Sequence, residues 1–141
     1  MDGDVMREVR SACADVITSF AHFVDHRYFE DAVALFAEDG IFERPGLTAR
    51  GRAEIAAIWV GRPASMITRH LCYAPFFTEI GLESASSVTG FTLYHVEHHG
   101  EGVPSLGQPR AIAEFHDRFR RTPDGWRIGH RKSVVTLRRA D

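Results

Sequence analysis

Residues 22–43 read HFVDHRYFEDAVALFAEDGIFE, and this stretch sets the order of elements in the first half of the chain. It begins in the last turn of an apolar helix, continues through a short second helix and enters a strand after EDG. Asp25 stands where the first helix ends. A carboxylate in that position can be half-buried, and partial burial can shift the pKa of an acid into the range that suits proton transfer. The alternative role for Asp25 is an N-cap of the helix that follows.

The composition predicts one globular domain spanning residues 1–141. Of the 141 residues, 44% are hydrophobic and 26% are charged, and a chain of this length supports a single core. The formal net charge of −2 predicts no attraction to nucleic acid or to an anionic membrane. No apolar run has the length of a secretion signal or a membrane span, so we expect a cytoplasmic protein.

Metal and cofactor signatures are missing from the sequence. Cys13 and Cys72 lack the spacing of a zinc site or a disulfide framework, so we expect two buried free thiols. His95, His98 and His99 do not suggest a metal site, because neighbouring strand residues point to opposite faces. The chain has no nucleophile elbow, phosphate-binding glycine loop or dinucleotide fingerprint, and we expect neither metal nor cofactor.

Helical periodicity dominates the first 60 residues. Apolar residues recur three and four apart over residues 4–25, which predicts a long helix with one buried stripe. The same period predicts a short helix over 29–37, ended by glycine, and a third over 51–60. Between the second and third helices, residues 41–44 predict a brief strand.

Alternating patterns follow and predict four long strands, at 67–74, 86–99, 110–121 and 126–139. The sequence TPDG at 122–125 joins the last two, and an Asp-Gly pair between alternating runs is a strong hairpin signal. Helices followed by an antiparallel meander predict an α+β fold with the helices covering one face of a curved sheet. A hollow between these layers would suit a small apolar ligand, with aromatic side chains as walls.

Three landmarks carry a family resemblance: FAHFVDHRYFEDAVALFAEDGIFE at 20–43, TRHL at 68–71 and FRRTPDGWRIGHR at 119–131. Over nearly the whole chain they resemble the SnoaL-like branch of the nuclear-transport-factor-2-like superfamily. The resemblance implies a cone-shaped fold, in which a curved, mostly antiparallel sheet and three N-terminal helices enclose a pocket. Members include dehydratases, a dehydrochlorinase, ketosteroid isomerase, polyketide cyclases and proteins without catalysis, so shape is implied more strongly than reaction.

The dehydratase and dehydrochlorinase members pair an Asp near the end of the first helix with a His early in the first long strand. The matching residues here are Asp25 and His70. A carboxylate bonded to one imidazole nitrogen fixes the tautomer and raises the basicity of the other nitrogen. The resemblance also places a second catalytic histidine at His98, although a slip of one residue would substitute His95 or His99.

Six further residues are candidates for substrate binding. Glu114 and His116 share one face of their strand, Phe115 and Asp117 share the other, and the sequence does not say which face looks inward. Val24 occupies the position of a pocket tyrosine in the dehydratases, and Tyr28 is a neighbouring tyrosine here. The predicted substrate-binding set is Tyr28, Phe42, Trp59, Tyr94, Glu114 and His116.

These features predict a small lyase or isomerase without a cofactor, dehydratase-like or cyclase-like. In it His70 acts as general base and acid on a hydrophobic or polycyclic molecule, and Asp25 orients it. One alternative is a non-catalytic protein that binds an apolar ligand in the same pocket. Another is an interaction module that uses a face containing Leu71, Tyr73, Phe77, Leu93 and Val135. In each case we expect a homodimer or a higher homo-oligomer.

Overall fold

The computed structural model describes residues 1–140. Within these residues there are three helices: α1 (Gly3–Asp25), α2 (Phe29–Ala34) and α3 (Gly51–Ala57). The same residues form seven strands: β1 (Phe36–Arg44), β2 (Leu47–Arg50), β3 (Met66–Cys72), β4 (Phe76–Ile80), β5 (Ser84–Glu97), β6 (Ala111–Thr122) and β7 (Gly125–Arg138).

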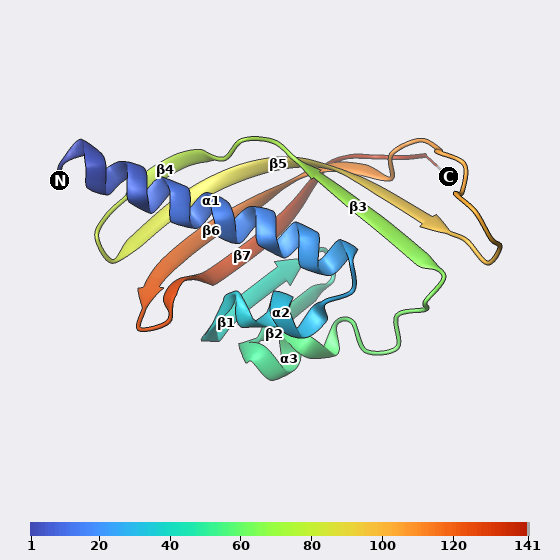
Figure 1. The fold of residues 1–141 in the computed structure, drawn as a ribbon, viewed down its shortest axis with the longest axis horizontal. Coiled ribbons are helices and arrows are strands. Elements are labelled where there is room, and N and C mark those ends of the chain that lie inside the picture. Colours follow the sequence, from blue (N-terminus) through green and yellow to red (C-terminus); the bar gives the residue numbers. More distant parts are fainter. Residues whose placement is uncertain (141) are drawn as a thin grey trace.

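The strands form one curved, unclosed sheet in the order β2-β1-β7-β6-β5-β3, with β4 paired to β5. All pairings are antiparallel except that of β1 with β7. Figure 1 shows α1 lying across the long strands, with α2 and α3 grouped near β1 and β2. The predicted fold class, an α+β fold with a mostly antiparallel curved sheet and three N-terminal helices, is therefore confirmed.

Helix α1 packs its apolar face against the sheet, and this face forms part of the core. Its N-cap is Asp2, whose carboxylate accepts a hydrogen bond from the backbone N–H of Val5 at 2.9 Å, which satisfies one of the free donors of the first turn. The predicted stripe is the buried face: Val9, Cys13, Val16, Ile17, Phe20, Ala21 and Val24. The β6–β7 ladder has register shifts near Ile112 and Arg118, and such irregularities increase the local bend and twist of a strand.

The second and third helices are shorter than the sequence predicts, and the brief strand is longer. Helix α2 ends at Ala34, and β1 already begins at Phe36 instead of residue 41. Phe36 lies opposite Ile128 of β7 and is completely buried, so pairing with a distant strand overrides the local helical period. Helix α3 likewise ends at Ala57, before residue 60.

Strands β2 and β4 were not predicted. Both are short, and they pair at the margin of the sheet, with β1 and β5 respectively. Their alternation is too brief to stand out from turn residues in the sequence. Helices long and apolar enough to cross a membrane are not found among residues 1–140.

Candidate functional site

A cavity of about 180 Å³ lies between α1, the turn after α3 and the concave face of the sheet. Its walls are mostly aromatic and aliphatic, and the polar groups in them are two arginines, one histidine and one serine. The lining residues are Phe20, Val24, Phe42, Arg44, Pro45, Trp59, Arg62, His70, Phe91, Leu93, Ala111, Ala113, Phe115, Ser133 and Val135. An apolar hollow with few polar groups is the usual form of a small-molecule site.

Asp25 sits at the C-terminal end of α1 and faces β3. Its Oδ1 accepts hydrogen bonds from the Thr68 hydroxyl at 3.0 Å and from the ring of His70 at 2.6 Å. Its Oδ2 accepts a bond from the backbone N–H of His70 at 2.8 Å. The N-cap of α2 is Tyr28, without a side-chain bond, so Asp25 does not cap that helix.

His70 carries the pair into the cavity. Its Nδ1 is the nitrogen that meets Asp25, which leaves Nε2 as the nitrogen available to a ligand. The ring lies 5.5 Å from the ring centre of Phe91 and 6.4 Å from that of Phe115. The side chains of His70 and Asp25 retain only 14% and 6% of their solvent exposure, so water screens their interaction weakly.

The pKa of Asp25 is set by two opposing causes. Burial alone would raise this pKa, but the hydrogen bonds and the charge interaction with His70 outweigh burial, and the bond from Thr68 adds to them. The net result is a pKa below the ordinary value of 3.8. Asp25 is therefore a carboxylate near neutral pH and can serve as the fixed acceptor that orients the imidazole.

A buried ion pair supports the cavity wall. Asp117 accepts hydrogen bonds from Nε and Nη2 of Arg131 at 2.7 and 2.8 Å, and both side chains are fully buried. The guanidinium carbon of Arg131 lies 3.8 Å from the ring centre of Phe115 and 4.5 Å from that of Phe20. Because both rings also line the cavity, the ion pair holds its aromatic wall in place.

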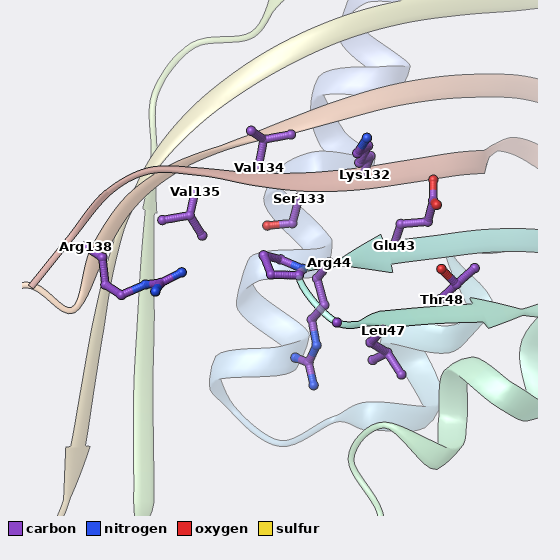
Figure 2. A pocket seen from close by; sticks show the side chains of 11 residues that line it. Glu43, Arg44, Leu47, Thr48, Lys132, Ser133, Val134, Val135 and Arg138 are labelled. Atoms are coloured by element: carbon purple, nitrogen blue, oxygen red, sulfur yellow. The ribbon is translucent and has the colours of Figure 1, made fainter.

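A groove beside the β1–β2 hairpin adjoins the cavity, with which it shares Arg44, Pro45, Ser133 and Val135. Figure 2 shows Arg44 and Ser133 pointing to the same side of the strands. Glu43 and Lys132, their neighbours in the chain, point to the other side. The alternation of β1 and β7 thus separates the cavity-lining polar groups from the charged outer face.

The structure brings four of the predicted site residues together: Asp25, His70, Phe42 and Trp59. The last two are buried and line the cavity. Tyr28 lies outside the cavity lining, 54% exposed, with its ring stacked on His26. Tyr94 is opposite Arg69 in the β3–β5 ladder, on the strand faces that alternate with His70 and Leu93 and point away from the cavity.

The remaining three predicted residues do not reach the cavity. Glu114 and His116 bond to each other at 3.0 Å on the outer face of β6, half exposed. The inner face of β6 carries Phe115 and Asp117, which resolves the choice that the sequence left open. His98 follows the end of β5, and its Nε2 lies 3.2 Å from the carbonyl oxygen of Gly102.

Several lining residues were not predicted as site residues. Leu93 and Val135, assigned from the sequence to an outer interaction face, line the cavity instead. Phe91, Phe115 and Ser133 were recognisable only as members of alternating runs. The β5–β6 register, with Phe91 opposite Ala113, is what brings these faces together.

A curved sheet covered by helices, with an Asp–His pair at an apolar cavity, defines a class of small α+β domains built around a pocket. Among the families of this class, the sequence pattern of the SnoaL-like domain family matches residues 6–132. The chain therefore belongs to the SnoaL-like domain family. No curated protein matches the sequence as a relative.

Solved structures agree with this fold. A nuclear-transport-factor-2-like protein with a cystatin-like fold from Novosphingobium aromaticivorans is 25% identical, with a TM-score of 0.78 over 91% of this chain and 82% of that one. A protein proposed to be a scytalone dehydratase from the same organism is 16% identical, with a TM-score of 0.83 over 96% and 89%. LinA is 15% identical, with a TM-score of 0.78 over 97% and 92%.

Proposed function

We propose that the protein is a small lyase or isomerase that needs no cofactor and that transfers a proton through His70. One observation carries this proposal. His70 bonds to Asp25 at 2.6 Å through Nδ1, and the same ring lines an apolar cavity. An imidazole fixed in one tautomer beside a ligand space is suited to general acid–base catalysis.

The proposed reaction starts when Nε2 of His70 removes a proton from a ligand carbon next to a carbonyl group. The electron pair of that C–H bond becomes the new carbon–carbon double bond of an enolate. In a lyase, its collapse expels a hydroxide from the β carbon, and the imidazolium returns the proton so that water leaves. In an isomerase, the proton returns to a different carbon. Asp25 stabilises the imidazolium in both cases.

The cavity volume favours a ligand with about one ring. An engineered apolar cavity of about 150 Å³ accommodates benzene, and the present cavity measures about 180 Å³. Phe42 and Trp59 supply flat walls for such a ring. A polycyclic ligand would have to extend beyond this cavity, into the groove that shares Arg44 and Ser133 with it. The resemblance to the proposed scytalone dehydratase supports an elimination reaction.

Proton NMR in D₂O tests the proposal. The test ligand is 3-hydroxycyclohexanone, a one-ring β-hydroxy ketone, and the signals to follow are its C2 protons and the alkene protons of the elimination product. Catalysed exchange or elimination is expected with the parent protein. His70→Gln should reduce the rate about 10²–10⁴-fold. His116→Gln, the same change on the outer face, should leave the rate unchanged.

A second candidate is a carrier for an apolar ligand, favoured by the aromatic lining of the cavity. Binding of cyclohexanone with no exchange above the His70→Gln level would support the carrier and contradict the enzyme.

We also propose a homodimer through the outer face of β3, β4 and the segment that joins them, where Leu71, Tyr73 and Phe76 are exposed. Sedimentation of the parent against Leu71→Ser tests this, since a dimer that persists in the variant contradicts the assignment.

A further inference from the structure

Two arginines line the mostly apolar cavity wall, and neither takes part in the mechanism above. Arg44 ends β1, and Arg62 lies in the turn after α3. Arg62 is half-buried, whereas Arg44 is exposed at the mouth of the cavity. A half-buried arginine normally has a carboxylate partner, because an unpaired cation loses part of its hydration without compensation.

Neither side chain has a hydrogen bond or an ion pair with another group of residues 1–140. The guanidinium carbon of Arg62 lies over the ring of Phe29, 5.7 Å from the ring centre. The nearest carboxylate to Arg44 in sequence is Glu43, but Figure 2 shows it on the opposite side of the strands. There the carboxylate of Glu43 bonds to His130.

The surroundings of the pair are cationic. Burial lowers the pKa of Arg62, and the charges of Arg44 and Arg27 lower it further. Partial loss of hydration also lowers the pKa of Arg44, whose side chain remains accessible to solvent. The Asp25 carboxylate acts in the opposite sense on Arg62, but its two oxygens are already bonded to His70 and Thr68.

The backbone at Arg62 is held in position. The guanidinium of Arg27 donates hydrogen bonds to the carbonyl oxygens of Arg62 and Pro63, at 2.9 and 3.2 Å. Arg27 itself adopts a left-handed backbone conformation, with φ of 67°, which is uncommon for a residue other than glycine. The turn that carries Arg62 is therefore tied to the end of α1, close to Asp25, before any ligand arrives.

We propose that Arg44 and Arg62 bind an oxyanion, a carboxylate or a phosphate, on a one-ring ligand whose ring occupies the cavity beside His70. The planar guanidinium group matches both oxyanions through paired N–H donors. This inference rests on the proposed function for the placement of the ring, and it adds the substrate class. The substrate is a cyclic acid, with its charge at the wall formed by β1 and the turn after α3.

Calorimetric titration with three ligands of the same ring tests the proposal: benzoate, phenyl phosphate and neutral benzamide. We expect one of the two anions to bind the parent at least about tenfold more tightly than benzamide, as charged hydrogen bonds provide. The preferred anion identifies the head group. Its affinity should fall with added salt, and that of benzamide should not.

Variants assign the effect to the pair. Arg44→Gln and Arg62→Gln should each reduce the preference for the anion over benzamide, and the double variant should abolish this preference. Arg121→Gln, the same charge change at an exposed position near the β6–β7 turn, is the matched control and should keep the preference. If Arg62→Gln does not fold, Arg44→Gln and the salt series remain as tests.

Equal binding of the anions and benzamide by the parent overturns the proposal, as does no binding of any of the three at millimolar concentration. So does an anion preference that survives in the double variant. This failure is separable from that of the proposed function. Anion preference without His70-dependent exchange would contradict the proposed enzyme and support the oxyanion site. Exchange without anion preference would support the enzyme and contradict the oxyanion site.

Discussion

Nδ1 of His70 lies 2.6 Å from Oδ1 of Asp25, although 45 positions separate the two residues in the chain. The contact exists because β3 passes the C-terminal end of α1. The same carboxylate also accepts the backbone N–H of His70 and the hydroxyl of Thr68. Asp25 thus fixes both the strand and the imidazole, and its structural and chemical contributions can be separated by experiment.

Asp25→Asn should destabilise the fold at neutral pH by about 1–3 kcal/mol, because a buried acceptor of three hydrogen bonds loses its charge. The folded-state pKa of Asp25 lies below the ordinary 3.8, so its stabilising effect is present above that pH and is lost as the pH falls through the folded-state value. Urea unfolding at neutral pH and at about pH 3 measures this. The difference in unfolding free energy between parent and variant should be smaller at about pH 3 than at neutral pH. A difference independent of pH would contradict the assignment.

His70→Gln should cost less than about 1 kcal/mol of stability, in contrast to its effect on proton transfer. The variant keeps the backbone N–H of residue 70 and the Thr68 hydroxyl as donors to Asp25. Thermal unfolding followed by circular dichroism checks this. A fall in Tm of ten degrees or so would instead identify the imidazole as a structural group.

Asp117→Leu and Arg131→Met should each destabilise the fold by about 3–5 kcal/mol, because each leaves a fully buried charge without its partner. The double variant should be more stable than either single one, since it leaves no uncompensated charge. Urea titrations of the four proteins form a double-mutant cycle. Additive losses in the double variant would contradict a direct coupling between the two side chains.

Cys13 should resist alkylation in the folded protein. Burial raises the pKa of its thiol to about 12, and the charge of Asp117 acts in the same direction. The thiolate is the reactive form, so iodoacetamide at about pH 8 should modify Cys13 only after unfolding in urea. Half-buried Cys72 should react first. Mass spectrometry of a time course checks the order, and equal rates in the folded protein would refute it.

The sequence anticipated the acid–base pair but little of its surroundings. Asp25 and His70 fall within motifs that resemble those of the family, and the structure places them in contact. For β6 the sequence could not choose a face, because each face carries charged residues. Asp117 is inside because its carboxylate accepts two hydrogen bonds from Arg131. A buried carboxylate needs such a partner, here one from the neighbouring strand, to offset its loss of hydration. Glu114 and His116 consequently face outward.

Local periodicity by itself determined α1 and the long strands, because the spacing of apolar residues along a helix or strand dictates which side can be buried. The hairpin at TPDG followed from its own turn residues. Tertiary structure decided where α2 ends, because Phe36 pairs with Ile128 of β7. It also decided which residues line the cavity. It also placed Arg44 and Arg62 in one wall. These features depend on contacts between distant segments, and no local pattern specifies which segments will meet.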